Sequence, residues 1–291
     1  QDIQKLQEIC GKEYFAEAAL LKDYDNEWDG EADIWHSEVD NISYDGWFRA
    51  FQKRHIPNDL VYINDDTQLE ELTKYKMLVY PHPTILTEKR VALLTAYAEQ
   101  GGTIVIGCRA GYKDLNGICY MMPMPGYAAE LCGTEVEEFT FLSPYDQKQQ
   151  VKLHDISVSA PCFNDVLSVT NGEVIGTFES NYYSGKPAAS HKALGKGNVY
   201  YFGAAFAEDT AMAFIDLAGI CTPLQLNSYM DMPENIELAI RGDAIFLLNY
   251  DEETKEINCT GSFQDLITGR IFSDYIQIPA YDAVVLKKMN S

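Results

Sequence analysis

The 291-residue sequence predicts an α/β fold, with a parallel sheet flanked by helices followed by a small antiparallel β-sandwich. Two apolar runs, at residues 76–80 and 103–106, enclose a segment of helical periodicity. Strands that are apolar throughout are typical of parallel sheets covered on both faces, and strands that alternate with helices form right-handed crossovers. A third observation predicts the sandwich, because short strand patterns without helices follow Pro223.

The helix between the two apolar runs has the clearest end signals. Thr87 is expected to cap its first turn and Gly101 to end it. Apolar side chains at helical spacing predict the face that packs on the sheet: Val91, Leu94, Tyr97 and Ala98. Lys89 and Arg90 are expected to be exposed on the opposite side.

Local patterns predict the remaining elements. We expect a short amphipathic helix at residues 1–12, a polar loop at 23–42 and irregular structure at 108–150. Further strands are expected at 14–21, 59–64, 174–178, 187–190 and 198–203, and further helices at 43–54, 69–75 and 208–218. The sandwich strands are expected at 236–240, 244–249, 256–259, 263–267, 275–278 and 283–286.

The composition disfavours several classes of partner. The 22 basic and 44 acidic residues give a net charge of −22, which argues against nucleic-acid binding and against an anionic membrane surface. No apolar run is long enough to span a bilayer, and the first residues do not resemble a signal peptide. We therefore expect no nucleic-acid or membrane partner, and a chain that was cut from a longer protein.

The cysteines indicate a reducing compartment. There are seven, which is an odd number, and none forms a Cys-x-x-Cys pair. A disulfide framework or a zinc site is therefore disfavoured, and a cytoplasmic location is favoured.

Cys108 is the one candidate nucleophile at a strand end. It lies in Gly107-Cys-Arg-Ala-Gly111, which is out of register with the Gly-x-nucleophile-x-Gly spacing of a strained turn. A cysteine nucleophile also needs a positioned base, and no His-x-Glu pair follows it. A small buried thiol is the simpler interpretation, but a cysteine-dependent amidotransferase-like or peptidase-like enzyme stays open.

The acidic stretch at residues 23–45 holds the other candidates. Asp25 to Gly30 begins like a calcium loop, but position 12 is His36 in place of a bidentate Glu, so a solvated acidic loop is favoured. Trp28 and Trp35, beside Glu27, suit either an interface or a sugar contact, because an indole ring buries area and keeps one polar group. Interface, sugar binding and plain packing all remain open for these residues.

No catalytic set is complete. Retaining glycosidases need two carboxyl groups about 5 Å apart, and sequence spacing alone nominates no such pair. No catalytic residue, metal ligand or cofactor site is therefore expected in this chain.

Several stretches together share the pattern of a known family. They are residues 24–28, 75–83, 94–107, 183–188, 195–201, 246–250 and 265–269. In order they resemble the region that follows the catalytic barrel in the β-galactosidases of glycoside hydrolase family 42, over about residues 14–288.

The resemblance implies a fold and a role. Residues 1–13 would be a remnant helix of the absent barrel. Residues 14–222 would form a flavodoxin-like trimerisation domain, similar to class I glutamine amidotransferases but without their nucleophile, and residues 223–291 the C-terminal β-sandwich. The family's catalytic glutamates belong to the barrel, so this chain would be a non-catalytic assembly segment. Its parent, a homotrimer, would hydrolyse terminal β-D-galactosides with retention. The resemblance also suggests that the loop with Trp28 lies near a neighbour's sugar pocket.

Overall fold

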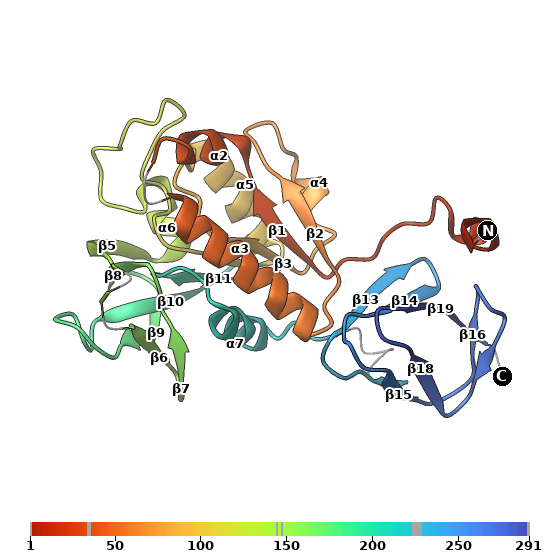
Figure 1. Ribbon diagram of the computed structural model, residues 1–291. Helices are drawn as coiled ribbons and strands as arrows, with labels where there is room; N and C mark the ends of the chain where they lie inside the picture. The colour runs from red at the N-terminus through yellow and green to blue at the C-terminus, as the bar shows by residue number, and fades with distance from the viewer. Residues whose placement is uncertain (1, 34–35, 144, 147, 223–228, 290–291) are drawn as a thin grey trace. The chain divides into compact units, whose positions relative to one another are not determined.

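The computed structural model describes residues 2–33, 36–143, 145–146, 148–222 and 229–289 (Figure 1). The chain forms two compact units, each built from separate stretches of sequence. The α/β unit comprises Ala18–Phe48 and Asp59–Ile220, and the β unit comprises Gln1–Glu17, Arg49–Asn58 and Cys221–Ser291. No described helix is long and apolar enough to cross a membrane.

A nine-stranded sheet, in the order β2-β1-β3-β4-β11-β10-β9-β6-β7, organises the α/β unit. Its parallel part pairs β1 with β3, β3 with β4 and β4 with β11. The strands are β1 (Ala18–Lys22), β2 (Asn58–Tyr62), β3 (Met77–Tyr80), β4 (Thr103–Ile106), β6 (Gln150–Leu153), β7 (Ile156–Ser159), β9 (Glu173–Phe178), β10 (Pro187–Leu194) and β11 (Gly197–Phe202).

The expectation of a purely parallel sheet was wrong for half of it. Strands β10, β9, β6 and β7 pair antiparallel with their neighbours, and β11 is antiparallel to β10 although it is parallel to β4. The two-residue turn Gly195–Lys196 between β10 and β11 gives the physical reason, because a parallel pair needs a crossover of a dozen or more residues. The unit is therefore a mixed α/β sheet.

Helices cover both faces of this sheet (Figure 1). They are α2 (Tyr24–Gly30), α3 (His36–Lys53), α4 (Leu69–Leu72), α5 (Glu88–Glu99), α6 (Ala129–Cys132) and α7 (Glu208–Ala218). Trp47 of α3 contacts Phe206, with ring centroids 5.1 Å apart, and Phe206 contacts Phe214 of α7 at 5.6 Å. These aromatic contacts form one side of the core, and α5 packs on the opposite face of the sheet.

Two segments expected to lack regular structure are ordered. The acidic stretch forms α2 and the start of α3 in place of a polar loop, because the Asp23 carboxylate caps α2 by accepting from the backbone N of Asn26 at 2.7 Å. Within residues 108–150 lie a 3₁₀ turn (Gly126–Ala128), α6 and β5 (Thr134–Phe141). Strand β5 pairs antiparallel with β8 (Phe163–Val169), with a bulge between Val136 and Glu138.

The β unit contains two antiparallel sheets, which confirms that part of the prediction. The sheets have the orders β12-β15-β18 and β13-β14-β19-β16-β17, and they share one apolar core. The strands are β12 (Met230–Asp231), β13 (Ile236–Arg241), β14 (Ala244–Asn249), β15 (Lys255–Cys259), β16 (Phe263–Asp265), β17 (Ile271–Phe272), β18 (Tyr275–Ile278) and β19 (Ala283–Lys288).

The first residues of the chain belong to this β unit. Residues 2–9 form α1 (Asp2–Lys5) and a 3₁₀ turn (Gln7–Ile9) in place of one helix. Ile9 packs with Ala244 and Val285, and the backbone N of Phe15 donates to the carbonyl O of Ile240 at 3.0 Å. The chain beginning therefore extends the edge of β13.

Candidate functional site

The carboxyl ends of β1, β3 and β4 lie at one edge of the sheet, because these strands are parallel. Ligands of open α/β sheets usually bind beyond this edge. The loops that follow the three strands supply Asp23, residues 81–85 and Cys108.

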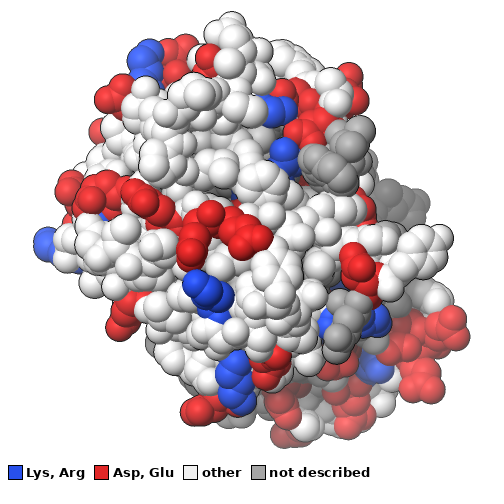
Figure 2. Space-filling model, turned by 90° about the vertical axis from the view of Figure 1, so that its left-hand side faces the viewer, with Lys and Arg blue, Asp and Glu red and all other residues white. Residues whose placement is uncertain are grey.

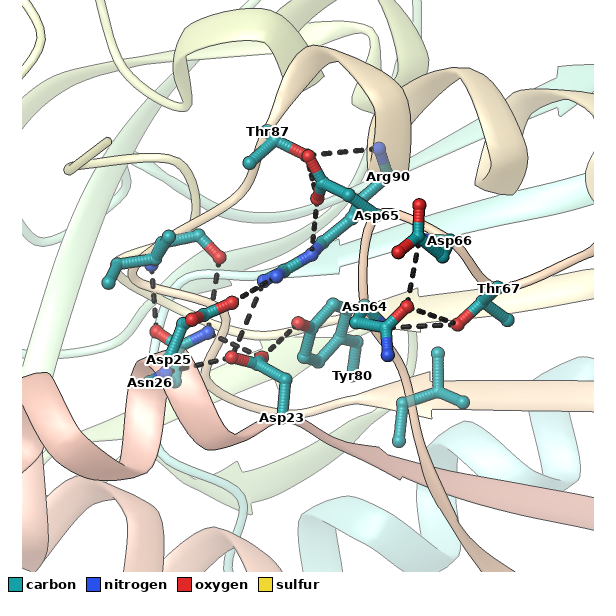
Figure 3. Close-up of polar contacts among 12 residues, drawn as sticks. Asp23, Asp25, Asn26, Asn64, Asp65, Asp66, Thr67, Tyr80, Thr87 and Arg90 are labelled. Carbon is teal, nitrogen blue, oxygen red and sulfur yellow. Dashed lines mark hydrogen bonds and ion pairs between the residues drawn. The ribbon is translucent and has the colours of Figure 1, made fainter. Parts of the chain in front are cut away.

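A buried arginine with three carboxylates occupies this edge (Figure 3). The Arg90 side chain is 1% exposed, which contradicts the expectation that it faces solvent. Its guanidinium forms ion pairs with Asp23 (Nη1 to Oδ1, 3.4 Å), Asp65 (Nε to Oδ1, 3.0 Å) and Asp25. A cation in the first turn of a helix opposes the helix dipole, and the three carboxylates outweigh that cost.

The same carboxylates fix the loops around them. Asp23 accepts from the Asn26 side chain at 2.6 Å and from the Tyr80 hydroxyl. Asn26 in turn binds the backbone of Ile85 in both directions, by accepting from its N at 2.7 Å and donating to its O at 3.1 Å. Asp65 accepts a hydrogen bond at 2.7 Å from the hydroxyl of Thr87, which is the N-cap residue of α5. The network therefore joins α2, the loop after β2, the loop after β3 and the start of α5.

A second ion-pair network lies after β4. Arg109 forms a bidentate contact with Asp33, with Nη2 to Oδ2 at 2.8 Å and Nη1 to Oδ1 at 3.3 Å. Lys113 donates from Nζ to Asp29 at 2.7 Å and to Asp33 at 3.0 Å. These contacts hold the loop after β4 against α2 and the residues after it. A bidentate contact between an arginine and a carboxylate is among the strong charge-assisted hydrogen bonds.

Asp165 is a fully buried carboxyl beside this second network. It accepts from the backbone N of Arg109 at 2.9 Å and from the Tyr201 hydroxyl at 2.8 Å. Burial raises the pKa of Asp165 to about 6, in spite of these donors.

The surroundings of Cys108 do not suit a nucleophile. Burial raises the pKa of its thiol well above the usual value, and the side chain has no exposed surface. His82 lies beside it, but His82 Nδ1 is 3.1 Å from the carbonyl O of Cys108 and faces the backbone. The left-handed residue of this turn is Arg109, with φ of 59°. An activated cysteine needs a reachable thiolate and a base, so the cysteine-enzyme alternative loses its support.

Trp28 and Glu27 both lie on α2, but they face different partners. The Trp28 side chain is 66% exposed and stacks on Tyr24, with ring centroids 5.7 Å apart. Tyr24 also stacks on Tyr62 of the edge strand β2 at 4.5 Å. Glu27 accepts an ion pair from Lys22 Nζ at 2.9 Å. Trp35 lies outside the described residues, so its predicted role stays a prediction.

The solvated acidic loop that was favoured over a calcium loop at residues 25–30 is wrong. These residues are helical, and the first of them, Asp25, pairs with Arg90. Among the residues that the structure describes, no three His, Cys, Asp or Glu side chains are placed to hold a metal ion.

Sequence reasoning missed the Arg90 network. A usable signal was present, because acidic residues follow the ends of two neighbouring strands at Asp23 and Asp65. An arginine in the first turn of α5, where a helix favours anions, needs such acidic partners.

Comparison with family models decides the relationship. Residues 16–223 match the model described as "Beta-galactosidase trimerisation domain". The chain belongs to glycoside hydrolase family 42. Residues 235–288 match a second model of that family, described as "Beta-galactosidase C-terminal domain".

The similar proteins are longer than this chain. β-Galactosidase GalA of Bacillus licheniformis is 24% identical over 295 residues, which cover 99% of this chain and 43% of that protein. β-Galactosidase BglY of Alicyclobacillus acidocaldarius is 26% identical, over 98% of this chain and 43% of that protein. The chain therefore spans less than half of the length of these relatives.

A solved structure shares the fold. The crystal structure of β-galactosidase from Bacillus circulans sp. alkalophilus has a TM-score of 0.86 at 22% identity, over 99% of this chain and 44% of that one. The two structures thus share a fold over almost the whole of this chain.

Proposed function

We propose that this chain is the assembly segment of a cytoplasmic β-galactosidase and has no hydrolytic activity of its own. The observation that carries the proposal is the match of residues 16–223 to a trimerisation domain model. The α/β unit would be a flavodoxin-like domain, related to class I glutamine amidotransferases, that has kept the sheet edge and lost its chemistry. Two ion-pair networks and a buried thiol occupy the place where such a domain would bind a substrate.

The parent protein would be a homotrimer whose barrel binds and hydrolyses terminal β-D-galactosides with retention. Support comes from the relatives, because those compared above carry the name β-galactosidase and extend well beyond the matched part. The role of this segment would be to hold the subunits in register.

Two measurements test this proposal. The mass of the purified chain in solution, compared with 32.8 kDa for one copy, should correspond to three copies. Incubation with a chromogenic β-galactoside should release no more product than the buffer alone. A strictly monomeric chain would refute the assembly role, and hydrolysis at enzyme-like rates would refute the non-catalytic role.

The exposed stack of Trp28, Tyr24 and Tyr62 favours a second candidate function, which is sugar binding. An exposed indole can pack on the C–H face of a galactose ring. Titration with galactose or lactose should then change the tryptophan fluorescence of the chain, and Trp28→Phe should reduce that change. Fluorescence that stays constant up to millimolar sugar would remove this candidate.

A further inference from the structure

The loop between β4 and the 3₁₀ turn exposes an unusual run of apolar side chains. We define the Met121 loop as residues 114–127. Its exposed large apolar residues are Leu115, Ile118, Met121, Met122 and Tyr127, and the side chain of Met121 is fully exposed. Single exposed apolar residues are common on proteins, but a contiguous group of them marks an interaction surface.

Beyond its first residue, Asp114, the Met121 loop also lacks charge. From Leu115 to Ala129 there is no Asp, Glu, Lys or Arg, in a chain whose residues are 23% charged. Figure 2, drawn from the side on which this loop lies in Figure 1, shows a broad uncharged area in its upper half, with acidic and basic groups at its margins. Two copies that each carry −22 repel one another over most of their surface. An uncharged apolar segment is where that repulsion is weakest and where contact buries the most apolar area.

The loop is held in place before any partner arrives. The carboxylate Oδ1 of Asp114 accepts from the backbone N of Asn116 at 2.8 Å and of Ile118 at 3.0 Å. Tyr120 N donates to Tyr112 O at 2.9 Å, so the loop doubles back as a short hairpin. At its base, Lys113 is fixed by its ion pairs with two carboxylates of the α2 region.

Such an arrangement lowers the cost of binding, because little backbone entropy remains to be lost on contact. The methionines can still adapt their shape to a partner surface, since their side chains are unbranched and flexible. A rigid base with adaptable apolar tips is what a protein contact surface requires.

We propose that the Met121 loop is a surface on which a second copy of this chain docks. The inference rests on the proposed assembly function and names the surface that carries it out. The occupant is a second copy because the matched domain is a trimerisation domain that includes the loop, and because an uncharged patch is what an acidic chain must present to itself.

The test uses the 291-residue chain and two aspartate variants. Met121→Asp and Ile118→Asp should each raise the dissociation constant for self-association at least about tenfold, because a charge would be buried without a partner. Ile271→Asp is the matched control, since Ile271 lies in the β unit and is 54% exposed against 64% for Ile118. It should leave the dissociation constant within about twofold. All three sites are exposed, so the variants should keep the circular dichroism spectrum and unfolding temperature of the unmodified chain.

A second readout needs no variant. The exposed Cys119 thiol lies inside the loop, and the exposed Cys10 lies in the β unit. Iodoacetamide should label Cys119 at least about tenfold more slowly in the associated chain than in the dilute monomer, while the rate at Cys10 stays constant.

The outcomes separate the two proposals. A chain that associates, with Cys119 equally reactive and both loop variants unaffected, would overturn the docking surface and leave the assembly function standing. A chain that stays monomeric at every accessible concentration would overturn both.

Discussion

Replacing Arg90 by methionine removes the cation that three carboxylates share while keeping a side chain of similar length. Asp23, which is as buried as Arg90 itself, would be left as an uncompensated charge. Asp25 and Asp65 have 32% and 25% exposed side chains, so water would stabilise them in part. Breaking a buried ion pair by removing one partner costs about 3–5 kcal/mol, and this partial exposure places Arg90→Met near the lower end.

The assay is urea and thermal unfolding of the variant beside Lys89→Met. Lys89 is the exposed neighbour of Arg90 on α5, so it controls for the loss of one positive charge and for helix propensity. A loss of about 3 kcal/mol should lower the unfolding temperature of the α/β unit by about 6–12 °C, since each kcal/mol shifts a domain of this size by about 2–4 °C. Lys89→Met should change stability by less than about 0.5 kcal/mol.

A second substitution tests the cause. If the isolated charge of Asp23 is responsible, Asp23→Asn on the Arg90→Met background should recover part of the lost stability. The stability of Arg90→Lys should lie between that of the unmodified chain and that of Arg90→Met, because an ammonium lacks the planar fork with which a guanidinium reaches three carboxylates. The reasoning would be refuted by an Arg90→Met protein whose stability lies within about 1 kcal/mol of the Lys89→Met protein.

Three further predictions concern other buried groups. Burial raises the pKa of Asp40 to about 6, so folding takes up a proton and the chain loses stability as pH rises from about 4 to about 6. In urea unfolding, the stability of Asp40→Asn should equal that of the unmodified chain near pH 4 and exceed it by about 1–3 kcal/mol at pH 7. A stability difference that does not change with pH would contradict this prediction. Iodoacetamide at pH 8 should leave the buried Cys108 unlabelled in native buffer and label it only in denaturant, as measured by mass spectrometry. Rapid labelling of Cys108 in native buffer would restore the cysteine-enzyme alternative. Asn249 donates to three backbone carbonyls inside the β unit, so Asn249→Ala should lower the free energy of unfolding in urea by about 2–4 kcal/mol. Replacing the exposed Asn258 by alanine should lower it by less than about 1 kcal/mol. Equal losses in the two variants would contradict this prediction.

The sequence was informative where local rules act. The capping residue Thr87, the two apolar strands around α5 and the bounds of α7 all follow from patterns within a dozen residues. The direction of β9 and β10 was harder to predict, because apolar alternation marks a strand without telling which neighbour it pairs with. Strand β5 was missed because its exposed glutamates and its bulge break the alternation.

The candidate site shows a different limit. Trp28 could be placed near acidic residues from the sequence, since all of them lie in one segment. The burial of Arg90 was harder to predict, because its three partners come from two segments separated by about forty residues, which meet only when β1 and the edge strand β2 are both in place. Long-range charge pairing leaves no periodic trace.

The seating of residues 13–15 against β13 has a consequence for the order in which the chain can fold. Synthesis proceeds from the amino end, so the segment around Ile9 is made well before its partners Ala244 and Val285. Until then Ile9 lacks the apolar partners that bury its side chain in the folded chain. A fragment of residues 235–288 alone would therefore lack part of the apolar packing of the β unit. A soluble and stable version should require residues 2–17 as well, either fused through a linker or added as a peptide.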